Sequence, residues 1–372
     1  MKEKIITFCK NQPVLIASFV MALATVFLIP PDEEYLGYCN TAVLIELFAL
    51  MGAIAGLRSI GIFEKMTDFL LSKAGTVRRL AVMLILISFF SAMLVTNDVA
   101  LLTFVPLTIL TFRSIPDEKH KILTIVLENA SANLGSMLTP VGNPQNLYLY
   151  DAYQLTTGAF LKTMLPAGIA GLICLLLLTL LLPAEPCRPE TSASAGIPKK
   201  PAVIYGIVFL ICLLTVFRVI PDWFCLILTV ILLLLTNPKL FGKVDYTLLA
   251  TFLFFFLFVG NIARIDAVSG FFSRVLTGHE LLISILLSQV ISNVPASVML
   301  SGFTDNGTAL LLGVNLGGLG TLIASMASLI SYQCYQKSEH PQTGKYLLTF
   351  SAVNFGTMAV LLLLQIFVFN KI

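Results

Sequence analysis

The sequence predicts an all-α polytopic membrane protein with two inverted repeats, each containing a re-entrant hairpin and a broken transmembrane helix. Three observations lead to this fold class. Of the 372 residues, 57% are apolar and only 12% are charged, whereas soluble domains carry about 25% charged residues. Apolar runs that approach the length of a membrane span are spread over the whole chain. Two polar stretches, 133–146 and 315–328, interrupt such runs at matching places in the two halves.

Seven apolar runs are uniform enough to be expected as single membrane-spanning helices. They lie at 14–30, 41–57, 163–182, 201–219, 223–235, 245–260 and 346–369. Two further segments, 61–74 and 262–278, mix apolar and charged residues at helical spacing, which is typical of a helix lying in the membrane interface. The stretch 184–200 is rich in proline, serine and charge. We expect it to be a cytoplasmic linker between the halves.

Two other apolar segments, 80–112 and 280–302, are expected to enter the membrane and leave it on the same side. Each is interrupted at its centre, the first by Thr-Asn-Asp at 96–98 and the second by Ser-Asn-Val-Pro at 292–295. Each arm is also short for a full crossing. The two polar tips are therefore expected near the middle of the bilayer.

The segments 122–150 and 308–333 are expected to be broken spans. In the first, Pro140 and Pro144 each remove a backbone donor and displace the carbonyl four residues earlier. Lipid cannot satisfy the freed groups, so such a break must be buried in protein or line a wet cavity. A shift of 182 positions aligns Asn133, Leu134, Gly135 and Thr139 with Asn315, Leu316, Gly317 and Thr321. Paired interrupted segments of this kind mark the binding site of a secondary transporter.

The basic residues predict how the repeats are oriented. With the N-terminus in the cytoplasm and each hairpin returning to its own side, 18 of the 23 Lys and Arg residues fall in cytoplasmic segments, in agreement with the positive-inside rule. The first repeat then occupies 1–183, and 201–372 holds one extra span and the second repeat in the opposite orientation. We expect a multi-pass protein of the plasma (inner) membrane with a cytoplasmic N-terminus and an outside C-terminus.

Small polar residues at the tips and breaks form the candidate binding site. Half-helix N-termini favour an anion, whereas exposed carbonyls favour Na⁺. The alternative is that these residues only join helices by hydrogen bonds, which is common in membranes, but four breaks in matched order favour a transport site. The substrate-binding candidates are Thr96, Asn97, Asn143, Asn146, Ser292, Asn293 and Ser325, and Ser328 aligns with Asn146.

Three acidic residues, Glu46, Asp98 and Glu128, lie at apparent membrane depth. A carboxyl group there is costly and is a functional candidate by default, so all three are candidates for proton coupling. Asp98 is the sharpest candidate because it follows Asn97 at a tip. Glu46 fits equally well as a protonated carboxyl bonded to a neighbouring helix, and Glu128 could instead cap the broken span.

At these residues the chain resembles the ion transporter superfamily, which includes divalent anion/sodium symporters, citrate transporters and arsenite permeases. The resemblance covers residues 41–369 and is carried by the two tips, by Asn-Leu-Gly…Thr-Pro-x-Gly-Asn-Pro-x-Asn and by Gly-x-Asn-Leu-Gly-Gly-x-Gly-Thr. It implies a scaffold domain that often dimerises and a mobile transport domain containing both hairpins. It also implies two Na⁺ sites, one using Asn97 and the Gly142 carbonyl, the other Asn293 and the Ala324 carbonyl.

The tips depart from the symporter pattern, which usually reads Ser-Asn-Thr. Here they read Thr-Asn-Asp and Ser-Asn-Val. Asp98 would repel a carboxylate unless it is protonated or paired with a cation. The glycine-rich motif and the Asn-x-Pro tip are more similar to the arsenite permease and sodium/proton antiporter branches.

We therefore expect a secondary active transporter that moves a small anion, such as citrate or a dicarboxylate, coupled to Na⁺ or H⁺ by alternating access. The alternatives are an arsenite or antimonite efflux permease and a Na⁺/H⁺ antiporter. The sequence contains neither His-Glu-x-x-His nor Gly-x-Ser-x-Gly, so an enzyme is not expected. The expected partners are the lipid bilayer, the small anion and a second copy of the chain, without nucleic acid, cofactor or any metal beyond Na⁺.

Overall fold

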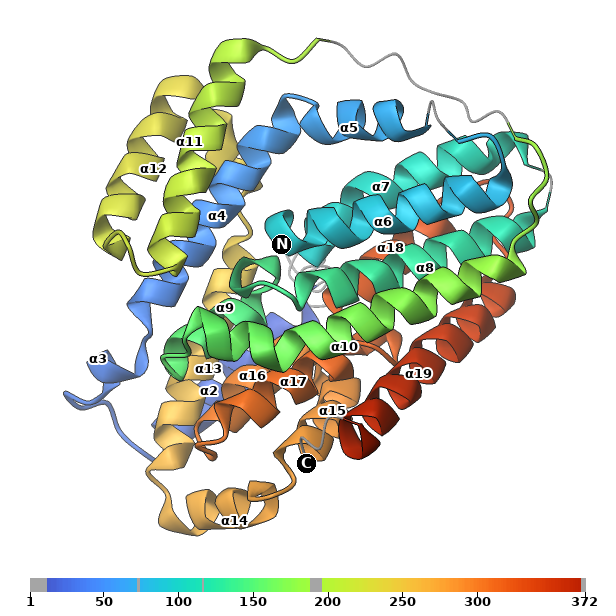
Figure 1. Ribbon diagram of the computed structural model, residues 1–372. Coiled ribbons are helices and arrows are strands. Elements are labelled where there is room, and N and C mark those ends of the chain that lie inside the picture. Colours follow the sequence, from blue (N-terminus) through green and yellow to red (C-terminus); the bar gives the residue numbers. More distant parts are fainter. Residues whose placement is uncertain (1–11, 72–73, 116, 188–195, 369–372) are drawn as a thin grey trace, which may run out of the picture.

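The computed structural model describes residues 12–71, 74–115, 117–187 and 196–368 (Figure 1). These residues form helices and short 3-10 turns, with one isolated bridge between Thr76 and Pro186. Up to residue 187 the elements are α2 (Pro13–Val26), α3 (Tyr35–Tyr38), α4 (Thr41–Ser59), α5 (Ile62–Leu71), α6 (Val77–Val95), α7 (Asn97–Thr111), η1 (Phe112–Ser114), α8 (Glu118–Ser136), η2 (Pro140–Gly142), α9 (Pro144–Ala152), α10 (Thr157–Leu178) and η3 (Thr179–Leu181).

The remaining elements begin at Lys199, one residue before the expected end of the linker at 184–200, of which residues 188–195 lie outside the described chain. They are α11 (Lys199–Val216), α12 (Asp222–Thr236), η4 (Pro238–Lys243), α13 (Tyr246–Ala263), α14 (Asp266–Leu276), α15 (Glu280–Ile291), α16 (Asn293–Ser301), α17 (Gly307–Gly317), η5 (Leu322–Ala324), α18 (Met326–Gln336) and α19 (Thr343–Phe367). The expectation of an all-helical chain is therefore confirmed for the described residues.

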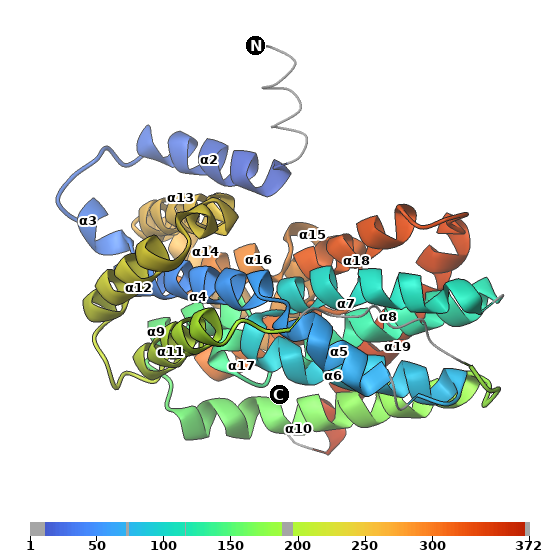
Figure 2. The same ribbon diagram turned by 90° about the horizontal axis from the view of Figure 1, so that it is seen from above.

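The helices pack into two groups that lie side by side (Figure 1). In the α4 group, α4 contacts α11, α12 and η4, while α13 contacts α2, α3 and α14. Figure 2 shows α2 lying on α13 at one edge of the molecule. In the α8 group, α8 contacts α6, α7, α10, α18 and α19, and α17 contacts α9, α10, α15, α16 and α19. The two groups meet where α4 contacts α9 and where α13 contacts α16.

Six helical segments of the described chain are long and apolar enough to cross a membrane: α4, α6, α10 with η3, α11, α13 and α19. α6 is the first arm of the hairpin expected at 80–112 and has 19 residues, so the expectation that this arm is short for a crossing is wrong. A seventh crossing would combine α14 and α15, which are bent by 110°. The expected span at 14–30 is longer than the helix that forms, because α2 has 14 residues and ends four residues before Pro30, and proline disfavours helical backbone before it. The span expected at 223–235 forms a slightly longer helix of 15 residues, and both helices are shorter than the six segments above.

Each hairpin is a pair of helices joined by one residue. Thr96 joins α6 to α7, and Ser292 joins α15 to α16. The helices of each pair contact one another. Both joining residues have positive φ, 72° for Thr96 and 77° for Ser292, in a region that residues with a side chain rarely occupy. The strained backbone reverses the chain abruptly and brings the N-terminus of the following helix to the tip.

The two broken helices pack closely on the hairpins. α8 ends at Ser136 and α9 begins at Pro144, while α17 ends at Gly317 and α18 begins at Met326. A Cβ atom added to Gly135 would lie 2.1 Å from the carbonyl oxygen of Phe89 on α6, and one added to Gly317 would lie 2.7 Å from Cβ of Ser288 on α15. Glycine at these aligned positions lets each broken helix approach its hairpin.

Two ion pairs connect the loop after α2 to the end of α13. Arg264 Nη2 lies 2.7 Å from Asp32 Oδ2, and its Nε lies 3.3 Å from Glu34 Oε2. The hydrogen bond from Arg264 holds the pKa of Asp32 below its usual value. Because these groups are exposed, the contact positions the loop more than it stabilises the fold.

Candidate functional site

Asparagine side chains from the two broken helices meet at the centre of the α8 group. Asn143 Nδ2 donates to Asn315 Oδ1 at 3.1 Å, and Asn315 Nδ2 donates to Asn146 Oδ1 at 2.6 Å. At the second break, Ser325 Oγ donates to Asn133 Oδ1 of the first half at 3.0 Å. The 182-position shift exchanges Asn143 with Ser325 and Asn315 with Asn133. The two halves thus make reciprocal contacts, which we call the asparagine cluster (Asn133, Asn143, Asn146, Asn315 and Ser325).

The first hairpin tip joins the asparagine cluster directly. Asn97 Nδ2 donates to Asn133 Oδ1 at 3.0 Å, and Asn97 Oδ1 accepts from the backbone N–H of Asp98 at 3.0 Å. Asn133 also donates to the Asn129 carbonyl at 3.1 Å. Asn97 is therefore fixed at both ends of its amide, and it begins α7 with its side chain turned into the cluster.

Asn146 holds the first break together from inside. Its Nδ2 lies 3.2, 3.3 and 3.0 Å from the carbonyl oxygens of Ser136, Met137 and Thr139. These carbonyls lie at the end of α8, where a helix leaves its last carbonyls without intrahelical partners. Asn146 thus replaces backbone donors that the break removes, and it is fully buried. Its position indicates a structural role behind the site rather than contact with a ligand.

The second tip meets the second break. Ser292 Oγ donates to the Ala324 carbonyl at 3.4 Å, and Gln289 Nε2 donates to the Gly317 carbonyl at 2.8 Å. Thr321 Oγ1 donates to the Gln289 carbonyl at 3.0 Å, as Thr139 Oγ1 donates to the Met93 carbonyl in the first half. Each break is therefore attached to the hairpin of its own half.

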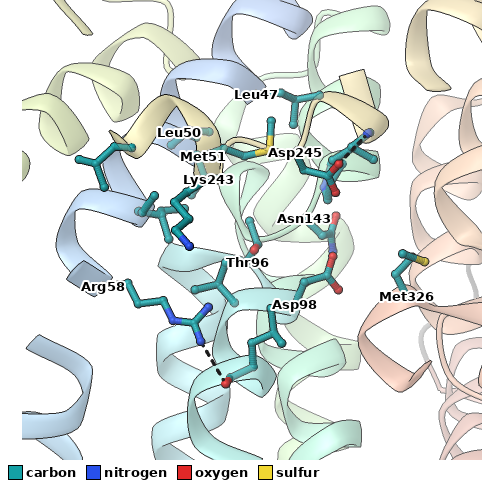
Figure 3. Close-up of a pocket in the computed structure, with 18 of the residues that line it drawn as sticks. Leu47, Leu50, Met51, Arg58, Thr96, Asp98, Asn143, Lys243, Asp245 and Met326 are labelled. Carbon is teal, nitrogen blue, oxygen red and sulfur yellow. Dashed lines mark hydrogen bonds between the residues drawn. The ribbon is translucent and has the colours of Figure 1, made fainter. Parts of the chain in front are cut away.

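A cavity of about 690 Å³ lies between the α4 group and the first tip. Thr96, Asp98 and Asn143 line it from the α8 group (Figure 3). A smaller cavity of about 70 Å³ is lined by both tips, through Asn97, Ser292 and Asn293, and by Ser325. Both cavities are also lined by Asp98, Pro144, Asp245, Leu248 and Met326, so they are neighbouring parts of one site.

The larger cavity carries a surplus of basic side chains. Arg58 at the end of α4 and Lys239 and Lys243 in η4 line it, against the two carboxyl groups of Asp98 and Asp245. Figure 3 shows Arg58 and Lys243 on one side and Asp98 and Asn143 on the other. Within the described chain, none of the five charged groups forms an ion pair. The cavity is therefore formally positive, which suits an anion.

The structure separates the predicted residues into three sets. Those that line the cavities are Thr96, Asn97, Asp98, Asn143, Ser292, Asn293 and Ser325. Those that lie in the breaks or in the first turn of the helix that follows, and line neither cavity, are Gly142, Asn146, Ala324 and Ser328. Glu46 and Glu128 lie on α4 and α8, and they also line neither cavity.

Glu128 lies inside the α8 group, away from the site. It is fully buried on α8, and Ser88 Oγ on α6 donates to its Oε1 at 3.4 Å. Its other oxygen has no hydrogen-bond partner among the described residues. Glu46 is buried on α4 in the other group. Neither carboxyl group can touch a ligand in these cavities.

The basic residues that line the larger cavity, which we call the basic wall (Arg58, Lys239 and Lys243), were not predicted from the sequence. Arg58, Lys239, Lys243 and Asp245 lie at helix ends in the α4 group, where they read as ordinary loop charges. Asn133 and Asn315 were also not predicted to belong to the site, although each begins one copy of the repeated motif. The 182-position repeat could have identified this pair of asparagines. Nothing in the sequence indicates that residues 58, 239 and 243 lie close together in the fold.

Paired breaks, strained tips and a polar cavity between two helix groups are features of a membrane transport protein. Comparison with known proteins agrees. A family model described as "Citrate transporter" (CitMHS) matches residues 5–306. An uncharacterized transporter of Methanocaldococcus jannaschii is 35% identical over 308 residues, which cover 82% of this chain and 83% of the relative. The inner membrane protein YbiR of Escherichia coli is 32% identical over 294 residues, covering 77% and 78%.

The chain belongs to the citrate transporter family. It is a multi-pass membrane transporter and not an enzyme, and its resemblance to the ion transporter superfamily is confirmed. The crystal structure of the Alcanivorax borkumensis YdaH transporter aligns with 95% of this chain and 97% of its own, with a TM-score of 0.56 and 13% identity. The two proteins therefore share a fold.

Replacing Asn315 should destabilise the protein more than an ordinary buried asparagine does. Asn315→Ala removes partners from both Asn143 and Asn146, which stay buried, and each unpaired buried group costs about 1–3 kcal/mol. The matched control is Asn354→Ala on α19, whose amide donates only to the Phe350 carbonyl within its own helix. Thermal unfolding of the purified variants measures the difference. An equal loss of stability in both would contradict the role of the asparagine cluster.

Proposed function

We propose that the chain transports a small carboxylate, such as citrate or a dicarboxylate, by alternating access coupled to Na⁺ or H⁺. The observation that carries the proposal is the basic wall of the larger cavity, which faces the first tip and the first break. The volume of about 690 Å³ lies within the usual range of about 300–1,000 Å³ for small-molecule sites.

Two helix N-termini add to the attraction for an anion. α7 begins at Asn97, and α9 begins at Pro144 with Asn143 as its N-cap. Both starts line the cavities, and the N-terminus of a helix carries a partial positive charge. The Thr96 hydroxyl provides a donor beside these termini, so a carboxylate can be held without a lysine or arginine inside the α8 group. Asn143, whose amide donates to Ser136 and Asn315, fixes the start of α9 by accepting from the Asn146 N–H.

We propose that the two halves are inverted repeats with re-entrant hairpins. The reciprocal contacts of the asparagine cluster, the single-residue joints at Thr96 and Ser292 and the aligned glycines Gly135 and Gly317 support this symmetry. Motion of the α8 group against the α4 group would then alternate the side to which the cavity opens. Arg58, Lys239 and Lys243 belong to segments predicted to be cytoplasmic, so this conformation would face inward, with the N-terminus inside.

A panel of ligands tests the substrate class. Citrate and succinate should raise the thermal unfolding temperature of the purified protein, because a ligand at 100 times its Kd stabilises the folded state by about 2.7 kcal/mol. Na⁺ should increase the effect if it is the coupling ion, and Li⁺ should act less. Stabilisation by arsenite and not by any carboxylate would contradict the proposal and favour the efflux permease.

We propose Asp98 as the coupling carboxyl group, because it is the only one of the three predicted acids that lines the cavities. Asp98→Asn fixes the side chain in a neutral form. Proton-coupled citrate uptake should then lose its dependence on external pH and its accumulation, whereas Na⁺-coupled uptake should need more Na⁺ with a nearly unchanged pH profile. Glu128→Gln, inside the α8 group, is the control and should keep both dependences. If Asp98→Asn also kept both, Asp98 would have no part in coupling.

A further inference from the structure

Arg58 connects the two helix groups at the wall of the cavity. Its Nη2 donates to the backbone carbonyl of Leu102 at 3.3 Å, and both residues line the 690 Å³ cavity. Arg58 is in the last turn of α4 and Leu102 is in α7. Figure 3 shows this hydrogen bond at the edge of the cavity, below Lys243 and beside Asp98.

Pro106 explains why this carbonyl accepts a bond from outside its helix. In a regular helix the carbonyl of residue 102 would accept from the N–H of residue 106. Pro106 stands inside α7 and has no N–H, and a proline ring pushes the carbonyl four residues earlier away from the axis. The acceptor for Arg58 is therefore created by the sequence of α7.

The hydrogen bond to Leu102 uses one of the five N–H donors of the Arg58 guanidinium group. A guanidinium group has five N–H donors and prefers the two oxygens of a carboxylate, to which it binds in a bidentate manner. Here its partner is a neutral carbonyl, and Arg58 has no ion pair with a described residue. It is also partly buried, whereas Lys239 and Lys243 are exposed. Arg58 is thus a basic residue of the cavity that is already hydrogen-bonded to a helix of the α8 group, through Leu102 of α7.

We propose that Arg58 determines substrate specificity by exchanging the Leu102 carbonyl for a carboxylate of the substrate. This rests on the proposed function. One carboxylate would bind at the tip, near Thr96 and Asn143, and a second would take the guanidinium from Leu102. The site therefore prefers a ligand with at least two carboxylates over a monocarboxylate.

The exchange also links binding to motion. While Arg58 is bonded to Leu102, it joins α4 to the first hairpin. A dicarboxylate that takes over the guanidinium replaces this direct bond with a link through the substrate, which is held at the tip as well, so the contact between α4 and α7 changes once the substrate is in place. A ligand that fails to reach Arg58 leaves the two groups joined.

Two substitutions separate the charge of Arg58 from its bond to Leu102. Arg58→Gln removes both, whereas Pro106→Ala restores an N–H for the Leu102 carbonyl and leaves the guanidinium free. Arg58→Lys keeps the charge without the bidentate geometry. Arg274→Gln is the matched control, because Arg274 is exposed on α14 and donates to the Gly270 carbonyl of its own helix.

Calorimetric titration of the full-length purified protein with citrate and with acetate measures the effect. Arg58→Gln should weaken citrate binding at least about tenfold and leave acetate binding nearly unchanged, and Arg58→Lys should fall between it and the wild type. Pro106→Ala should bind citrate as tightly as the wild type or a few fold more tightly, because no bond has to be broken. Arg274→Gln should match the wild type for both ligands.

Three results would overturn the inference. If Arg58→Gln bound citrate like the wild type, Arg58 would not contact the substrate, although the proposed function would stand. If Pro106→Ala lost as much citrate affinity as Arg58→Gln, the shape of α7 and not the charge would be responsible. If the wild type bound neither carboxylate, the proposed function would fail and this inference with it.

Discussion

The structure depends on the need to satisfy polar groups that are buried at the breaks of two helices. Away from water, each unpaired backbone or amide group costs several kcal/mol. The chain meets this need by pairing the breaks with each other, so Asn315 serves Asn143 and Asn146 while Ser325 serves Asn133. The carbonyls of each break accept bonds from side chains of their own half, and the asparagine side chains beside the breaks are in turn paired between the halves. This constraint fixes the relative position of the halves and explains why the interrupted motifs occur as a pair.

The same arrangement creates a site that can hold an anion. Once the asparagine side chains are used inside the α8 group, the starts of α7 and α9 and the Thr96 hydroxyl remain toward the cavities. The positive φ of Thr96 and Ser292, a strain of about 1–3 kcal/mol each, sets where those termini point. The α4 group then supplies charge from outside, through Arg58 and the lysines of η4. In the proposed function, recognition is thus divided between the two helix groups that would move relative to each other.

Much of this architecture could be predicted from the sequence because breaks in apolar helices have local causes. Prolines at 140 and 144 and the polar residues at 96–98 are visible along the chain, and the 182-position repeat shows which segments correspond. The basic wall could not be predicted, because Arg58 and Lys243 meet only through the packing of α4 on η4. Nor could the sequence tell that Asp98 lines the cavity while Glu128 accepts a hydrogen bond from Ser88, since the side to which each carboxyl group points depends on how α7 and α8 pack.

The central claim is that the cavity between the two groups binds and moves a carboxylate. It is tested most directly by uptake of radiolabelled citrate into proteoliposomes that contain the purified protein, with an imposed Na⁺ gradient or pH gradient. The wild type should accumulate citrate above the equilibrium level under at least one gradient. Asn143→Ala, which removes the N-cap of α9 at the cavity wall and the bonds to Ser136 and Asn315, should reduce uptake at least about tenfold. Absence of wild-type uptake under both gradients, or unchanged uptake by Asn143→Ala, would contradict the account.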